Sequence, residues 1–122
     1  MRLLKDRLLE MDHVTHIEHG ATVPGVRPTL ILRLNLVPKM HRIKGAATRF
    51  GFNVQETYAG AVLTHSKHRD FSVEQDTHIS PSTFVVRNDE ENISDELRGK
   101  VLGFFRQLGQ PRKKHLRIVK RN

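Results

Sequence analysis

The chain of 122 residues contains no cysteine and no tryptophan, and its aromatic side chains are one tyrosine and six phenylalanines. Without cysteine there is no disulfide, no thiolate nucleophile and no zinc site with cysteine ligands. The shortage of large rings predicts a core built mainly from Leu, Val and Ile. It also leaves few rings for stacking on bases, so any contact with nucleic acid should be made mainly to phosphates.

Long apolar runs are also missing. No stretch approaches the ~20 apolar residues that a membrane-spanning helix needs, and residues 1–13 are too charged to form the apolar region of a signal peptide. We therefore expect an intracellular, cytoplasmic protein that has no membrane partner. The length predicts a single domain over residues 1–109, followed by a basic C-terminal tail at residues 110–122.

Acidic side chains are absent from two segments of this chain, whose net charge is +8. No acidic residue occurs between His19 and Gln55, a segment with six Lys or Arg residues. None occurs in residues 97–122 either, where there are nine Lys or Arg residues. Exposed helices usually mix charges, because oppositely charged pairs four residues apart stabilise them. Clusters of Lys and Arg without acidic side chains are typical of a surface that contacts a polyanion. Arg outnumbers Lys by 13 to 8, and the guanidinium fork suits phosphate.

The first basic segment has a clear secondary-structure pattern. Residues 29–37 alternate between apolar leucines and other side chains, which predicts a half-buried strand. Pro28 and Pro38 stand at its two ends, where a missing N–H is tolerated. Over residues 39–50 the apolar side chains recur at steps of three and four, which predicts an amphipathic helix. Gly51 then occupies the position of a C-terminal cap.

A second main helix is predicted over residues 94–108. Ser94 is a suitable N-cap, two acids in the first turn complement the helix dipole, and Gly109 marks the end. A shorter helix is expected over residues 2–11. We expect the following side chains of the two main helices to be buried: Met40, Ile43, Phe50, Leu97, Val101, Phe104, Phe105 and Leu108.

Strands that follow one another, with helices between and after them, predict an α+β fold with a largely antiparallel sheet and two main helices. Further strands are expected at residues 52–64 (with a break near Gly60), 71–79 and 83–87. One candidate order is a ferredoxin-like βαββαβ core over residues 29–119. The alternative is a sheet that dimerises, with the helices of both copies packing across it.

Acidic side chains on the predicted strand at residues 71–79 raise an enzymatic alternative. On such a strand Glu74, Asp76 and His78 would share one side. Metal-dependent nucleases hold Mg²⁺ with carboxylates that converge in this way. The competing interpretation is a solvated sheet face, on which like charges two residues apart are common.

Histidines recur at steps of three in two places, at His13, His16 and His19 and at His65 and His68. On a helix this spacing would bring the imidazoles to one side, as a metal site requires. On a strand His16 would point away from its two neighbours. Neither group is accompanied by cysteine or by the acids of a metalloenzyme motif, and ordinary surface histidines account for both. We therefore predict no metal site and no cofactor.

The leading hypothesis is a non-enzymatic protein that binds nucleic acid, with RNA slightly ahead of DNA. No nucleotide-binding glycine loop and no nucleophile elbow is present. A structural or assembly protein, such as a viral or ribonucleoprotein shell component that forms homodimers or higher oligomers, is the second hypothesis. The phosphate contacts are predicted from a basic helix and a basic arm: Arg42, Lys44, Arg49, Arg112, Lys113, Lys114, Arg117, Lys120 and Arg121.

Overall fold

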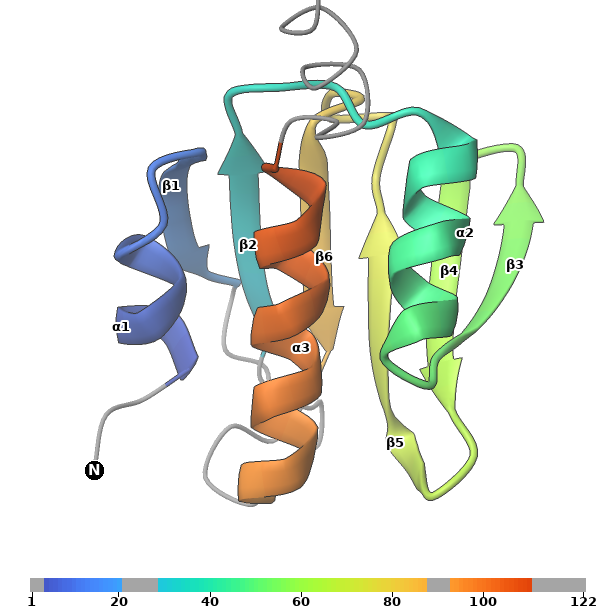
Figure 1. Ribbon diagram of the computed structural model, residues 1–122. Coiled ribbons are helices and arrows are strands. Elements are labelled where there is room, and N and C mark those ends of the chain that lie inside the picture. The colour runs from blue at the N-terminus through green and yellow to red at the C-terminus, as the bar shows by residue number, and fades with distance from the viewer. Residues whose placement is uncertain (1–3, 21–28, 88–92, 111–122) are drawn as a thin grey trace, which may run out of the picture.

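A computed structural model describes residues 4–20, 29–87 and 93–110 and shows an α+β fold (Figure 1). All six strands of the described residues join one sheet in which every neighbouring pair is antiparallel, which confirms the predicted fold class. The elements are α1 (Leu4–Leu9), β1 (Val14–His19), β2 (Thr29–Leu34), α2 (Met40–Arg49), β3 (Asn53–Thr57), β4 (Gly60–His65), β5 (His68–Gln75), β6 (Thr83–Arg87) and α3 (Asp95–Leu108).

The strand order is β1-β2-β6-β5-β4-β3. The chain leaves β2 through α2, enters the sheet again at its far edge as β3, and returns strand by strand to β6 (Figure 1). The ferredoxin-like order is not confirmed, because four strands rather than two lie between the two main helices and no described strand follows α3. This long crossover brings α2 and α3 next to each other.

All three helices cover the same face of the sheet (Figure 1). Edge-to-face contacts among Phe84, Phe104 and Phe105 join β6 to α3, with ring centroids 5.0 to 6.5 Å apart. The predicted core of the two main helices is largely confirmed, since Met40 and Phe50 are partly buried and the remaining six side chains are buried. The helix-facing strand residues in the same core include Leu30, Leu32, Leu34, Leu63, Val73 and Val86.

Two predicted glycine ends are present, for different physical reasons. Gly51 follows α2 with a φ of +83°, the left-handed conformation expected of a C-terminal glycine. Gly109 ends α3 with a φ of −85°, which any residue can adopt. A Cβ at Gly109 would lie 2.2 Å from Nδ1 of His13, whose Nε2 is 2.7 Å from the carbonyl oxygen of Phe105. The close approach of the His13 ring therefore accounts for this glycine.

Several predicted boundaries are corrected. The strand predicted at residues 71–79 ends at Gln75, because Asp76 turns the chain: its Oδ1 accepts a hydrogen bond of 3.1 Å from the backbone N–H of His78. The strand predicted at residues 29–37 ends at Leu34. The predicted tail lies outside the described residues from position 111 onward.

Candidate nucleic-acid interface

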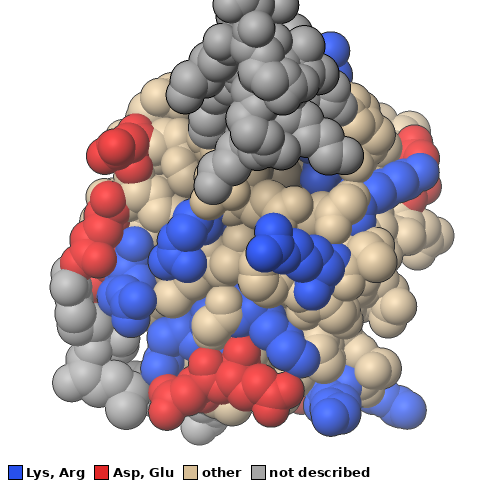
Figure 2. Space-filling view, in the orientation of Figure 1, with Lys and Arg blue, Asp and Glu red and all other residues tan. Residues whose placement is uncertain are grey.

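The neighbouring helices α2 and α3 present a basic surface (Figure 2). Their acids are Asp95 and Glu96 alone, both in the first turn of α3, and α2 has none. Figure 2 shows Lys and Arg side chains across the middle of this face. Beyond the first turn of α3 the surface therefore carries charges of one sign. The cations of the two helices are Arg42, Lys44, Arg49, Arg98, Lys100 and Arg106.

A groove with a volume of about 240 Å³ lies between the C-terminal end of α2 and the middle of α3. Arg49 and Arg106, from different helices, both line it. Two of the residues that line it, Gly99 and Gly103 of α3, have no side chain to fill it. A Cβ at Gly103 would come within 2.3 Å of the Phe50 ring, whereas a Cβ at Gly99 would meet none of the described atoms within 4 Å. The groove is thus open beside Gly99, filled by the Phe50 ring over Gly103, and bordered by two guanidinium groups.

Arg42 and Arg49, two of the predicted phosphate ligands, lie beside the C-terminal end of α3. Nη2 of Arg42 donates to the carbonyl oxygens of Gln107 at 3.1 Å and Gln110 at 2.7 Å. The Gln107 carbonyl also accepts from the backbone N–H of Gln110, so the Arg42 guanidinium ties α2 to the C-terminal turn that follows α3 and has a structural role. Nη1 of Arg49 donates to Oε1 of Gln107 at 3.1 Å, and its guanidinium lies 5.6 Å from the centroid of the Phe50 ring.

Lys44, the third predicted ligand in α2, points away from the groove. Its ammonium is paired with the carboxylate of Glu56 on β3, and both side chains are about half exposed. Exposed ion pairs of this kind contribute only about 0–1 kcal/mol, so Lys44 can exchange Glu56 for a phosphate at little cost. The structure therefore brings Arg42 and Arg49 together and places Lys44 on another side of α2.

Arg106 is a groove-lining cation that the sequence prediction did not include among the phosphate ligands. It is exposed on α3, lines the groove beside Arg49, and has no polar side-chain partner among the described residues. The helical pattern of residues 94–108 already places it on the outward side. Its proximity to α2 became visible only through the tertiary fold. By contrast, Arg98 is 13% exposed and bound to Asp95 at 2.6 Å.

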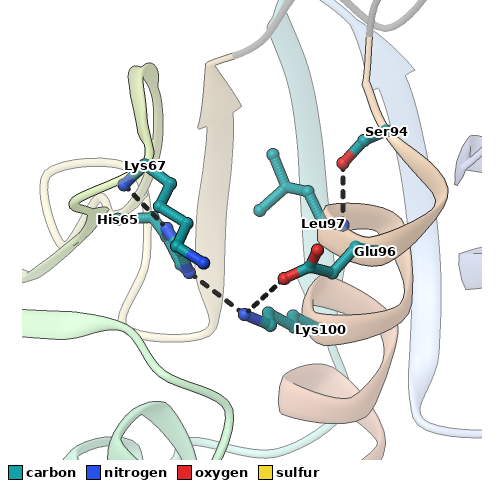
Figure 3. Close-up of polar contacts among 6 residues, drawn as sticks. All are labelled: His65, Lys67, Ser94, Glu96, Leu97 and Lys100. Carbon is teal, nitrogen blue, oxygen red and sulfur yellow. Dashed lines mark hydrogen bonds and ion pairs between the residues drawn. The ribbon is translucent and has the colours of Figure 1, made fainter.

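A cluster of titratable side chains lies at the end of this surface near the start of α3 (Figure 3). Nζ of Lys100 is 3.1 Å from Oε1 of Glu96 and 3.3 Å from Nε2 of His65, a residue of β4 that is 6% exposed. Burial, helped by the positive charge of Lys100, lowers the pKa of the His65 imidazole. The hydrogen bond from Lys100, together with its charge, lowers the pKa of the Glu96 carboxyl. At neutral pH His65 is therefore uncharged and Glu96 is ionised.

The three residues of the nuclease alternative do not share a strand face. Glu74 lies on β5 and accepts a hydrogen bond of 2.7 Å from Nε of Arg87. Asp76 and His78 follow the end of the strand and form the turn described above. Within residues 4–20, 29–87 and 93–110, no group of three or more His, Cys, Asp or Glu side chains is arranged to hold a metal ion.

Two of the three histidines near the N-terminus lie on a strand, and none lies on a helix. His16 and His19 are exposed on β1, which has an irregularity in its pairing between Val14 and His16. His13 precedes the strand and packs against the end of α3. The one-sided arrangement that a helix would have produced is therefore not formed.

The basic arm predicted to bind phosphates lies outside the part of the chain that the structure describes. Its six residues are Arg112, Lys113, Lys114, Arg117, Lys120 and Arg121. Comparison with protein-family models, with curated proteins and with solved structures finds no match to this chain. None of the described helices is long and apolar enough to cross a membrane.

Proposed function

We propose that this protein binds nucleic acid without catalysing a reaction, and that it favours RNA over DNA. The observation that supports the proposal is the groove of one-signed charge between α2 and α3. Two segments far apart in the sequence place Arg49 and Arg106 on its sides, and none of the residues that line it is acidic. A chain of regularly spaced phosphates can contact several such cations at once.

The form of this surface favours contact with the sugar-phosphate backbone over reading of bases. A protein that reads duplex DNA in the major groove usually inserts one protruding helix. Here α2 and α3 lie side by side and both pack on the sheet (Figure 1). Double-stranded RNA is recognised mostly by its shape and by contacts to phosphates and 2′-hydroxyls. We therefore propose RNA slightly ahead of DNA as the ligand.

The basic arm extends the surface in this proposal. Arg42, Lys44 and Arg49 from α2, with the six cations after residue 110, would give about six to nine phosphate contacts. The logarithm of the affinity should then fall with the logarithm of the salt concentration with a slope of about −5 to −8. A slope near zero would rule out binding through phosphates.

The experiment is fluorescence anisotropy of the full chain with labelled single-stranded RNA, duplex RNA and duplex DNA over a series of NaCl concentrations, in the presence of Mg²⁺. The probes are then checked on a denaturing gel. We expect binding with steep salt dependence and intact probes. Cleaved probes would contradict the non-enzymatic assignment and would favour the alternative hypothesis of a metal-dependent nuclease.

Two arginine variants test whether this particular surface makes the contact. Arg106→Gln removes an exposed cation beside the groove. Arg33→Gln removes an exposed cation on β2 between the buried Leu32 and Leu34, hence on the sheet face away from the helices. We expect Arg106→Gln to make the salt slope shallower by about 1 and Arg33→Gln to leave it unchanged. Equal effects would show that net charge, rather than this surface, drives binding.

A further inference from the structure

Two hydrogen-bond donors face each other at His65. Its Nδ1 accepts the backbone N–H of Lys67 at 3.2 Å. Because a backbone N–H can only donate, a neutral imidazole that makes this bond carries its proton on Nε2. That Nε2 lies 3.3 Å from Nζ of Lys100, and an ammonium also only donates. The two groups therefore lack an acceptor between them.

The other neutral tautomer does not remove this conflict. With the proton on Nδ1, the Nε2 atom can accept from Lys100, but Nδ1–H then opposes the N–H of Lys67. Protonation of both nitrogens adds a third positive charge beside Lys67 and Lys100. An imidazole that carries a proton on one nitrogen can accept only at the other. In both neutral tautomers and in the cation, at least one of the two N–H donors, from Lys67 or Lys100, therefore lacks an acceptor at the ring.

Positive charge exceeds negative charge around this conflict. The charge of Lys67 acts on both His65 and Glu96. Its side chain runs along the imidazole toward the side that Lys100 occupies (Figure 3). Glu96 is the one carboxylate in this group; it is 62% exposed, and among the described residues its ion pair is with Lys100. Two ammonium groups and an imidazole N–H thus lie near a single carboxylate, which binds only one of them, and this arrangement repels a metal cation and attracts an anion.

Gly51 lies beside these donors and has no side chain that could cover them from the side of α2. A Cβ at Gly51 would lie 3.7 Å from Nζ of Lys100 and 3.8 Å from Nε2 of His65. Any side chain built outward from that Cβ would begin beside both donors. The His65 ring is held in place by an edge-on contact with Phe52, with centroids 5.6 Å apart. The site therefore combines one fixed, buried donor with two cations on flexible side chains.

We propose that His65, Lys67 and Lys100 form a phosphate-binding site, which Glu96 closes as a latch until a phosphate displaces its carboxylate. One phosphate oxygen can accept from both Nε2–H and Lys100, and another can accept from Lys67. A single carboxylate on Lys100 cannot satisfy all three donors. The inference rests on the proposed function for the source of the ligand, which is a backbone phosphodiester or a terminal phosphomonoester of a nucleic acid.

Two acid variants of α3 test the latch. Glu96→Gln and Asp95→Asn each remove one negative charge from the same helical turn, but Asp95 is bound to Arg98 at 2.6 Å and lies outside the cluster. We expect Glu96→Gln to bind labelled RNA about five-fold more tightly than Asp95→Asn, the effect of releasing one exposed ion pair. Equal affinities of the two variants would overturn the latch.

Inorganic phosphate tests the site without nucleic acid. In a titration of the full chain followed by NMR of the imidazole nitrogens, we expect the His65 Nε2 signal to shift in the wild type and not in Lys100→Gln. Unmoved signals in the wild type would overturn the site even if RNA binds through the groove. A shift in a protein that binds no RNA would retain the site and refute the proposed function.

The source of the phosphate is distinguished by two oligonucleotides of one sequence, with a 5′-phosphate or a 5′-hydroxyl. A preference for the 5′-phosphate that disappears in Lys100→Gln identifies a terminal phosphomonoester. Equal wild-type affinities, both weakened by Lys100→Gln, identify a phosphodiester. If thermal melts show that Lys100→Gln does not fold, Lys67→Gln, which changes an exposed side chain, takes its place. No weakening in a folded variant would overturn the site.

Discussion

Helices α2 and α3 lie side by side on one face of the sheet, but only α3 carries the usual signals at its start. Oγ of Ser94 accepts from the N–H of Leu97 at 3.1 Å (Figure 3). Two acids occupy the first turn. The N-cap of α2 is Lys39, which makes no capping bond through its side chain, and no acid follows. Gly45 further weakens α2, by about 1 kcal/mol relative to alanine.

The difference shows that local sequence supports α3, whereas α2 depends on its neighbours. Ile43, Ala46 and Ala47 are fully buried, and α2 contacts α3, β3 and β4. Tertiary packing usually supplies most of a helix's stability, and that allows α2 to omit acids and a cap. In return Arg42 donates to carbonyls at the end of α3.

The largest expected effect comes from truncating the buried face of each helix. Ile43→Ala in α2 and Leu102→Ala in α3 should each lower the free energy of unfolding by about 3 kcal/mol, measured by urea denaturation. Amide hydrogen exchange should distinguish the two variants. Amides of α2 should lose protection by local opening in Ile43→Ala, while α3 keeps its protection in Leu102→Ala. Local opening of α3 in Leu102→Ala would contradict the proposed difference.

A pair of glycines in α3 should respond in opposite directions to alanine. Gly99→Ala should raise the free energy of unfolding by about 1 kcal/mol, because its Cβ enters open space and alanine favours the helix. Gly103→Ala should lower it by about 1–2 kcal/mol, since the Phe50 ring must leave its place against α3. Chemical denaturation checks both. A stabilising Gly103→Ala would mean that this ring does not hold α2 to α3.

Replacing the N-cap residues should reduce the difference in local stability between α2 and α3. Ser94→Ala removes the cap of α3 and should destabilise the protein by about 1 kcal/mol. Lys39→Ser offers α2 a cap and should stabilise it by about 0.5 kcal/mol. Thermal denaturation followed by circular dichroism measures both. No change in Ser94→Ala would show that packing, rather than the cap, also secures α3.

Acid should weaken the protein through His65. Its folded pKa is lowered below the usual 6.5, so the unfolded chain binds the proton first. Stability should be complete above pH 6.5 and should fall as the pH drops from there toward the folded pKa, by at most about 1.4 kcal/mol per pH unit. The free energy of unfolding of His65→Gln, measured by urea denaturation at a series of pH values, should depend less on pH in this range. The exposed His78→Gln serves as the control and should keep the wild-type slope.

Periodicity predicted the elements well and their ends less well. The step from alternation to a three-and-four pattern at Pro38 correctly separated a strand from α2. Alternation continues through Ile79, but β5 ends at Gln75, because the side chain of Asp76 bonds to the backbone and forms a turn. Side-chain-to-backbone bonds of this kind leave the alternating pattern unchanged, so the extra residues were predicted as strand.

The sequence by itself determined the antiparallel α+β class, the capped start of α3, and two acid-free segments, because these depend on local patterns and on composition. Only the tertiary structure decided which cations meet. The long crossover from β2 to β3 brings α2 beside α3, and so places Arg49 next to Arg106 and gives Arg42 its structural role. The same packing sets Lys100 against His65, 35 residues away in the chain. Contacts at such separations depend on strand order, which periodicity does not encode.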